Sequence, residues 1–191
     1  MAKTSVGVYL GPEYVDVIQI EGSVHNAKVL AFAREKIVDS SKTNQEADQA
    51  SHEECISVAV SEALNKVQNK TGDVLSVLSY NNTVIRNFSM PKLPKAEQIQ
   101  AILFEAKKYI PFNLTDITND FKAINHPKDK SSMRIFFFAS PKDRINKAVE
   151  IFNKAKSRVV GLDIIPFALF RGLSFLKKVS VKETVIVIYV D

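Results

Sequence analysis

The sequence contains very little cysteine. Its one cysteine, Cys55, cannot form a disulfide within the chain, which is typical of proteins in a reducing compartment. Six glycines and seven prolines in 191 residues are too few for a collagen-like or low-complexity chain. A hydrophobic fraction of 46% and a charged fraction of 25% are those of ordinary folded proteins. The composition therefore predicts a globular protein.

Long apolar runs are also missing. No stretch approaches the roughly 18 to 20 apolar residues that a membrane-spanning helix needs, and the opening residues, MAKTSVGVYLG, lack the apolar core and cleavage signal of an exported protein. We therefore expect a cytoplasmic protein. Three histidines occur without the cysteine, histidine or carboxylate spacing of a metal site or a catalytic triad, so we predict neither.

Positive charge is concentrated in the middle of the chain. The net charge is +5 overall, with −4 in residues 1–79, +8 in residues 80–162 and +1 in residues 163–191. A basic segment of this kind attracts anionic lipid, an acidic protein or nucleic acid, and it is equally compatible with a solvated surface. Nucleic-acid binding is disfavoured because aromatic residues do not interleave with lysine and arginine, as the consecutive phenylalanines 136–138 illustrate.

The periodicity of apolar residues predicts a mixed α/β protein that opens with three antiparallel strands. The first predicted elements are strands at 5–10, 14–20 and 27–38, an amphipathic helix that ends near residue 70, and a strand at 73–80. After them we expect a strand at 83–90, a helix at 95–110, strands at 118–125 and 133–139, a helix at 141–156, a strand at 159–166, a helix at 167–179 and a strand at 183–191. The last predicted strand is apolar on both faces, and the sequence supplies no further element to cover them. We therefore expect a truncated fold.

A glycine turn joins the first two predicted strands. Strand, glycine turn, strand, strand and helix is the order of an actin-like nucleotide-binding half-domain, in which this turn cradles phosphate. Such a turn needs an acid on the first strand, free backbone amides and a basic or polar residue on the second strand. Only Gly11 fits, because Tyr9 replaces the acid, Pro12 removes an amide, Glu13 adds negative charge and Asp16 replaces the basic residue. The pattern predicts no ATPase, and an ordinary hairpin turn is the alternative reading of Gly11.

A resemblance to a known family rests on three segments. FSMPKLPKAEQIQAILFEAKKYIPFNLTDITNDFKAI, RIFFFASPKDRINKAVEIFNKA and VVGLDIIPFALFRGL resemble the PilM family of actin-like type IV pilus assembly proteins. More distantly, the chain is similar to FtsA and to the cytoplasmic part of the type II secretion L protein. The resemblance covers nearly the whole chain.

The resemblance implies an α/β fold of two parts. An actin-like, ribonuclease H-like basal subdomain would comprise residues 1–79 and 163–191, and a strand-helix-strand-strand subdomain, residues 80–162, would be inserted in it. The family continues into a second half that completes the nucleotide site, so ATP and Mg²⁺ are expected only if that half restores the site. The next phosphate loop would begin near Tyr189, where an acid and a glycine are expected and Tyr-Val-Asp is found, and Asp191 would serve only if the register slips by two.

The resemblance also implies an adaptor at the cytoplasmic face of the inner membrane. Its partners would be the amino-terminal tail of a PilN-like inner-membrane protein, held between the two subdomains, and other pilus assembly components, with no nucleic acid. The alternative is an actin-like, ATP-binding cytoskeletal or cell-division protein similar to FtsA. The residues expected to bind the peptide bracket the junction of the inserted helix with its strands: Arg86, Pro91, Leu93, Glu105, Tyr109, Pro111 and Phe112. Plain packing is the alternative role of Leu93, Pro111 and Phe112.

Overall fold

The computed structural model describes residues 4–23, 26–38, 45–67, 72–78, 83–126, 128–176 and 186–189. Contacts within the chain divide it into two units. Unit 1 comprises Met1–Ser79 and Lys147–Asp191, and unit 2 comprises Tyr80–Asn146. Among the described residues no helix is both long enough and apolar enough to cross a membrane.

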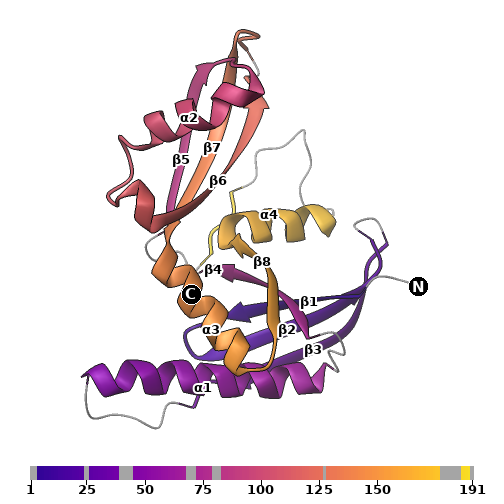
Figure 1. Ribbon diagram of the computed structural model, residues 1–191. Coiled ribbons are helices and arrows are strands. Elements are labelled where there is room, and N and C mark those ends of the chain that lie inside the picture. Colours follow the sequence, from indigo (N-terminus) through magenta and orange to yellow (C-terminus); the bar gives the residue numbers. More distant parts are fainter. Residues whose placement is uncertain are drawn as a thin grey trace. The chain divides into compact units, whose positions relative to one another are not determined.

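Unit 1 is built on a five-stranded sheet with the order β3-β2-β1-β4-β8 (Figure 1). Its elements are β1 (Thr4–Leu10), β2 (Tyr14–Glu21), β3 (Lys28–Lys36), α1 (Gln45–Lys66), β4 (Asp73–Leu78), β8 (Arg158–Ile164) and α4 (Ile165–Phe175). The first three strands are antiparallel, as the sequence predicted, and β4 runs parallel to both β1 and β8.

Alternation along the first two strands places the core of unit 1. Val6, Val8, Val15 and Val17 are at most 4% exposed, because every second residue of a strand faces the same side of the sheet. The helical spacing of α1 places its own apolar residues in the same cluster, and α3 (Lys142–Lys154) contributes Phe152, which is fully buried. Figure 1 shows α1 and α3 lying against this sheet.

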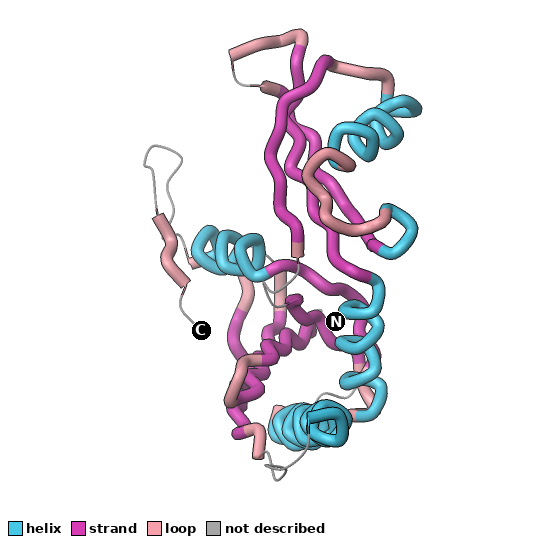
Figure 2. Tube along the Cα trace, turned by 90° about the vertical axis from the view of Figure 1, so that its left-hand side faces the viewer, coloured by secondary structure: helices cyan, strands magenta, loops and turns pink. Residues whose placement is uncertain are grey.

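Unit 2 is a three-stranded antiparallel sheet with one long helix on one face. Its elements are β5 (Val84–Pro91), α2 (Lys95–Ala106), the 3-10 turn η1 (Leu114–Asp116), β6 (Ile117–Asn125) and β7 (Ser132–Pro141), with the strand order β5-β7-β6. Alternate residues of β7, from Met133 to Ala139, pack against Ile102 and Ala106 of α2. In Figure 2, α2 lies to one side of the three strands. The predicted strand-helix-strand-strand order is confirmed.

Three expectations differ from the structure. Residues 186–189 of the predicted last strand are not assigned to a strand and are 41% to 83% exposed, and the rest of that segment lies outside the described residues. The helix predicted over 95–110 ends at Ala106, and Ile99 is 49% exposed because α2 turns only its Ile102 and Ala106 side into the core. The second boundary falls within α3 rather than after residue 162, because Ile151 and Phe152 pack in the core of unit 1.

The revised boundary changes the distribution of charge. Unit 2 has 11 lysines and arginines against 6 aspartates and glutamates, a net charge of +5. Unit 1 has 15 of each sign and is neutral. The whole net positive charge of the chain therefore belongs to unit 2.

Candidate functional site

The turn between β1 and β2 is a closed hairpin. The backbone N–H of Gly11 donates to the carbonyl oxygen of Tyr14 at 2.9 Å, and Leu10 pairs with Val15. A Cβ at Gly11 would lie 2.9 Å from that same oxygen, so the close approach of the two strands requires glycine. The contacts of Gly11 are therefore those of an ordinary hairpin turn.

Three further residues, Pro12, Glu13 and Asp16, decide whether this turn could bind phosphate. Pro12 has no N–H, and the carbonyl oxygen of Glu13 accepts a hydrogen bond from the N–H of Ile37 at 2.8 Å. Asp16 forms a two-pronged ion pair with Arg34, with distances of 2.6 Å to Nε and 2.7 Å to Nη2. This hydrogen bonding to Asp16 raises the pKa of the Arg34 guanidinium above its ordinary value.

These features do not fit a phosphate-binding turn. The backbone N–H of Gly11 already donates a hydrogen bond within the hairpin, and Pro12 has no N–H to donate. The carboxylate of Glu13 would repel phosphate. Near the end of β1, the hydroxyl of Tyr9 hydrogen-bonds to the hydroxyl of Tyr189. In the described part of the chain no group of acidic, histidine or cysteine side chains is placed to hold a metal ion.

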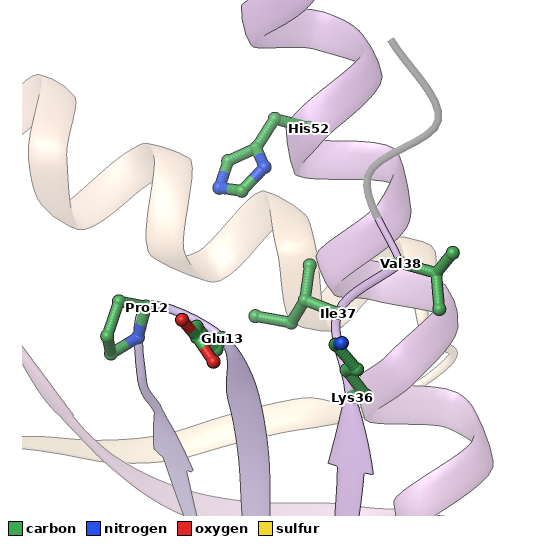
Figure 3. A pocket seen from close by; sticks show the side chains of 6 residues that line it. All are labelled: Pro12, Glu13, Lys36, Ile37, Val38 and His52. Carbon is green, nitrogen blue, oxygen red and sulfur yellow. The ribbon is translucent and has the colours of Figure 1, made fainter. Parts of the chain in front are cut away.

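A pocket beside this hairpin was not predicted from the sequence. Its volume is about 420 Å³, and its lining residues are Pro12, Glu13, Lys36, Ile37, Val38 and His52. Figure 3 shows His52 on α1, Glu13 at the hairpin and Ile37 after β3 around the same space. Residues of the hairpin, of the end of β3 and of α1 meet here only after the sheet has formed, so no local pattern indicates the pocket.

The seven residues predicted to bind a peptide all lie in unit 2, and the structure brings some of them together. Tyr109 stacks on Phe88, with ring centroids 6.3 Å apart and an interplanar angle of 26°. Arg86 is two residues before Phe88 in β5, so both side chains lie on the face of the sheet that α2 covers. Arg86 is exposed, and its Nη1 donates to the carbonyl oxygen of Ile85 at 2.8 Å.

The segment after α2 supplies the exposed aromatic residues of this region. Tyr109 is 44% exposed and Phe112 is 36% exposed, whereas Ile110 between them is buried. Glu105 forms an ion pair with Lys108 at 2.7 Å, and this hydrogen bond raises the pKa of the lysine above its ordinary value. Pro111 is exposed in the bend that follows.

Two of the seven residues do not join this group. Pro91 is exposed at the end of β5, but its position in the alternation puts it on the opposite face of the sheet from Arg86. Leu93 packs against the core of unit 2, and its carbonyl oxygen accepts a hydrogen bond from Gln98 at 2.8 Å. The contacts of Leu93 are those of core packing, which was the alternative role for this residue.

Sequence reasoning missed Phe88, which links Arg86 to Tyr109. The alternation of TVIRNFSM indicated that Phe88 shares a face with Arg86. The stack, however, joins Phe88 in the strand before α2 to Tyr109 in the segment after α2, and no local pattern indicates such a contact. We call the residues of this group together with Phe88 the β5–α2 surface: Arg86, Phe88, Glu105, Tyr109, Pro111 and Phe112.

The chain is an α/β protein of two units, and the β5–α2 surface on unit 2 is its candidate site. The family model described as "Type IV pilus assembly protein PilM" matches residues 7–189, so the chain belongs to this family. This is the family that the sequence resemblance predicted. No curated protein is similar enough to the chain to count as a match.

Two solved structures are similar to the chain. One is a PilM–PilN type IV pilus biogenesis complex, with 21% identity and a TM-score of 0.72 over 91% of this chain and 50% of that chain. The other is the cytoplasmic domain of EpsL, an inner-membrane component of the type II secretion system of Vibrio cholerae, with 11% identity and a TM-score of 0.49 over 84% of this chain and 57% of that chain. The chain thus spans about half the length of the PilM structure, whose likeness shows the fold.

Proposed function

We propose that this protein is a non-catalytic adaptor of type IV pilus assembly that binds an extended peptide of a PilN-like inner-membrane protein along β5. The observation that carries the proposal is the position of β5 at the edge of its sheet, beside the stacked pair of Phe88 and Tyr109. An edge strand presents unpaired backbone groups. A peptide that adds to such an edge gains affinity from main-chain hydrogen bonds and specificity from side-chain pockets.

The partner is inferred from the similar structure, which is a complex of PilM with PilN. We expect the amino-terminal cytoplasmic tail of a PilN-like protein to place apolar side chains against Tyr109 and Phe112. Arg86 is exposed and near this pair, so it is placed to meet a carboxylate or a carbonyl oxygen of the peptide. The protein would then work at the cytoplasmic face of the inner membrane with other pilus assembly components.

The hairpin at Gly11 supports the non-catalytic part of the proposal. A phosphate group would find the Gly11 amide occupied, no amide at Pro12 and a carboxylate at Glu13. The same features disfavour an actin-like ATPase or an FtsA-like cell-division protein. Because the chain spans half of the PilM structure, ATP and Mg²⁺ would need a second half that restores the site.

A titration of the chain with the amino-terminal peptide of the PilN-like protein from the same organism tests the proposal. Replacing Tyr109 or Phe112 by alanine should cost about 1–3 kcal/mol of binding free energy, as buried aromatic anchors do. Phe104→Ala is the matched control, because Phe104 is a 73% exposed aromatic residue of α2 outside the β5–α2 surface. Tyr109→Ala and Phe112→Ala variants that fold and bind as tightly as Phe104→Ala would overturn the proposal.

A further inference from the structure

The loop between β6 and β7 is held together by the side chains of His126 and Asp129. The Nδ1 atom of His126 accepts hydrogen bonds from the backbone N–H of Lys128 at 3.3 Å and from that of Asp129 at 3.1 Å. The carboxylate of Asp129 accepts from the N–H of Ser131 at 2.9 Å and from the hydroxyls of Ser131 and Ser132. One imidazole and one carboxylate therefore act as the acceptors that order the described residues of this loop.

The contacts of His126 require a neutral ring. In neutral imidazole one nitrogen accepts and the other donates, whereas both nitrogens of the protonated ring carry a hydrogen and donate. In a protonated ring, Nδ1–H would be directed at the two backbone N–H groups from which Nδ1 accepts, so both amides would lose their acceptor. Histidine is the side chain whose charge ordinarily changes between about pH 5 and 8. The conformation of the loop is therefore tied to the charge on His126.

Asp129 offers the protonated ring a different partner. The pKa of Asp129 is lowered to about 2, mainly by hydrogen bonds from Ser131 and Ser132 and also by the charge of His126. This carboxylate is therefore ionised when the ring takes up a proton. A hydrogen bond from an imidazolium N–H to a carboxylate is charge-assisted and stronger than a hydrogen bond between neutral groups.

The other charged groups that the loop and its strands place around His126 are positive. They are Lys92 after β5, Lys128 and Lys130 in the loop, and Arg134 in β7. The N–H of Lys92 donates to the carbonyl oxygen of Ser131 at 2.8 Å, and Arg134 pairs with Ile124, two residues before His126. These cations repel a protonated ring, and Asp129 is the acid of the loop that attracts it.

We propose that the β6–β7 loop is a two-state switch that is set by protonation of His126. In the neutral state Nδ1 holds the amides of Lys128 and Asp129, as in the structure. In the protonated state the ring turns and donates to the carboxylate of Asp129, and the two amides of these exposed residues pass to solvent. The loop stays ordered in both states, because the hydrogen bonds from Ser131 and Ser132 to Asp129 do not involve the ring. The switch rests on this loop alone and is independent of the proposed adaptor function.

Residue-resolved NMR of the full chain between about pH 8 and 5 tests the switch. The amide signals of Lys128 and Asp129 should shift with one midpoint, equal to the midpoint of the ring signals of His126. Below this midpoint the protection factors of both amides against hydrogen exchange should fall at least about fivefold, the equivalent of one hydrogen bond. His126→Asn is the decisive variant, because the side-chain oxygen of asparagine accepts hydrogen bonds but does not titrate in this range. In this variant both amides should stay protected throughout.

His52→Asn is the matched control, because it removes a histidine of α1 in unit 1 and should leave the transition of the loop unchanged. The proposal is overturned if the two amides do not respond when the ring of His126 titrates, or if the response persists in His126→Asn. It is also overturned if β6 and β7 lose protection together with the loop, since that result means unfolding. If His126→Asn does not fold, the wild type decides, because different midpoints for the ring and the amides contradict the switch.

Discussion

The hydroxyl of Tyr9 hydrogen-bonds to the hydroxyl of Tyr189, although 180 positions separate the two residues. The resemblance implies that Tyr9 replaces the first acid of an actin-like site and that the second phosphate loop would begin near Tyr189. Two phenols therefore meet where the resemblance expects the groups that hold a metal ion and phosphate.

We predict that the chain does not bind Mg-ATP and that Tyr9→Asp alone does not create binding. A carboxylate at this position would restore one group of the site, but the hairpin would still offer phosphate no free amide at Gly11 or Pro12. Isothermal titration calorimetry of the wild type and the variant checks this. Micromolar affinity, or phosphate release by the wild type, would contradict it.

Binding of the PilN-like peptide should weaken as salt rises. Unit 2 has a net charge of +5, and at physiological ionic strength screening shortens the reach of exposed charges to about 8 Å. The dissociation constant should therefore rise steadily between low salt and half-molar salt. A constant affinity over this range would show that the charge of unit 2 takes no part.

Phe152→Ala should destabilise unit 1 and leave unit 2 folded. Phe152 lies in α3 and is fully buried in the core of unit 1, and removing a buried phenylalanine side chain costs about 3–5 kcal/mol. Phe137→Ala, which removes an equally buried side chain from unit 2, is the matched control and should have the opposite pattern. Amide hydrogen exchange resolved by residue measures both. Loss of protection in unit 2 after Phe152→Ala would mean that the second half of α3 belongs to unit 2.

The loop between β6 and β7 should lose stability only in strong acid. Hydrogen bonds from the Ser131 and Ser132 hydroxyls and from the Ser131 N–H lower the pKa of Asp129 to about 2, from an ordinary 3.8. Because the pKa in the folded state is the lower one, the contribution is complete above the ordinary pKa and disappears as pH falls through about 2. An NMR titration of the carboxyl carbon should have a midpoint near 2, and Ser131→Ala should raise it. A midpoint near 4 in the wild type would refute these hydrogen bonds.

The elements could be predicted from the sequence because apolar spacing of 2 and 3.6 residues reports directly which side of an element is buried. Thus β7 is buried at Ile135 and Phe137, and α1 at Val60, as their periods indicate. The second domain boundary could not be predicted, because α3 is one continuous helix and its period does not reveal that its two ends belong to different units.

The candidate site could be predicted only in part, for a related reason. The exposed aromatics Tyr109 and Phe112 follow a helix that ends before Pro111, which the sequence shows. The stack of Tyr109 on Phe88 and the pocket beside Glu13 depend on contacts between distant segments, which no local pattern encodes. The apolar run 183–191 suggested a strand, but its described residues 186–189 form no ladder, because pairing depends on a neighbouring strand as well as on composition.

The measurement that tests the central claim most directly is residue-resolved amide hydrogen exchange of the chain with and without the amino-terminal peptide of the PilN-like protein. If the peptide adds to the sheet along β5, every second amide of Val84–Pro91, namely those directed away from β7, should become protected, and the ring signals of Phe88 and Tyr109 should shift. Saturating peptide that leaves the β5 amides unchanged and protects β6 or unit 1 instead would contradict the claim.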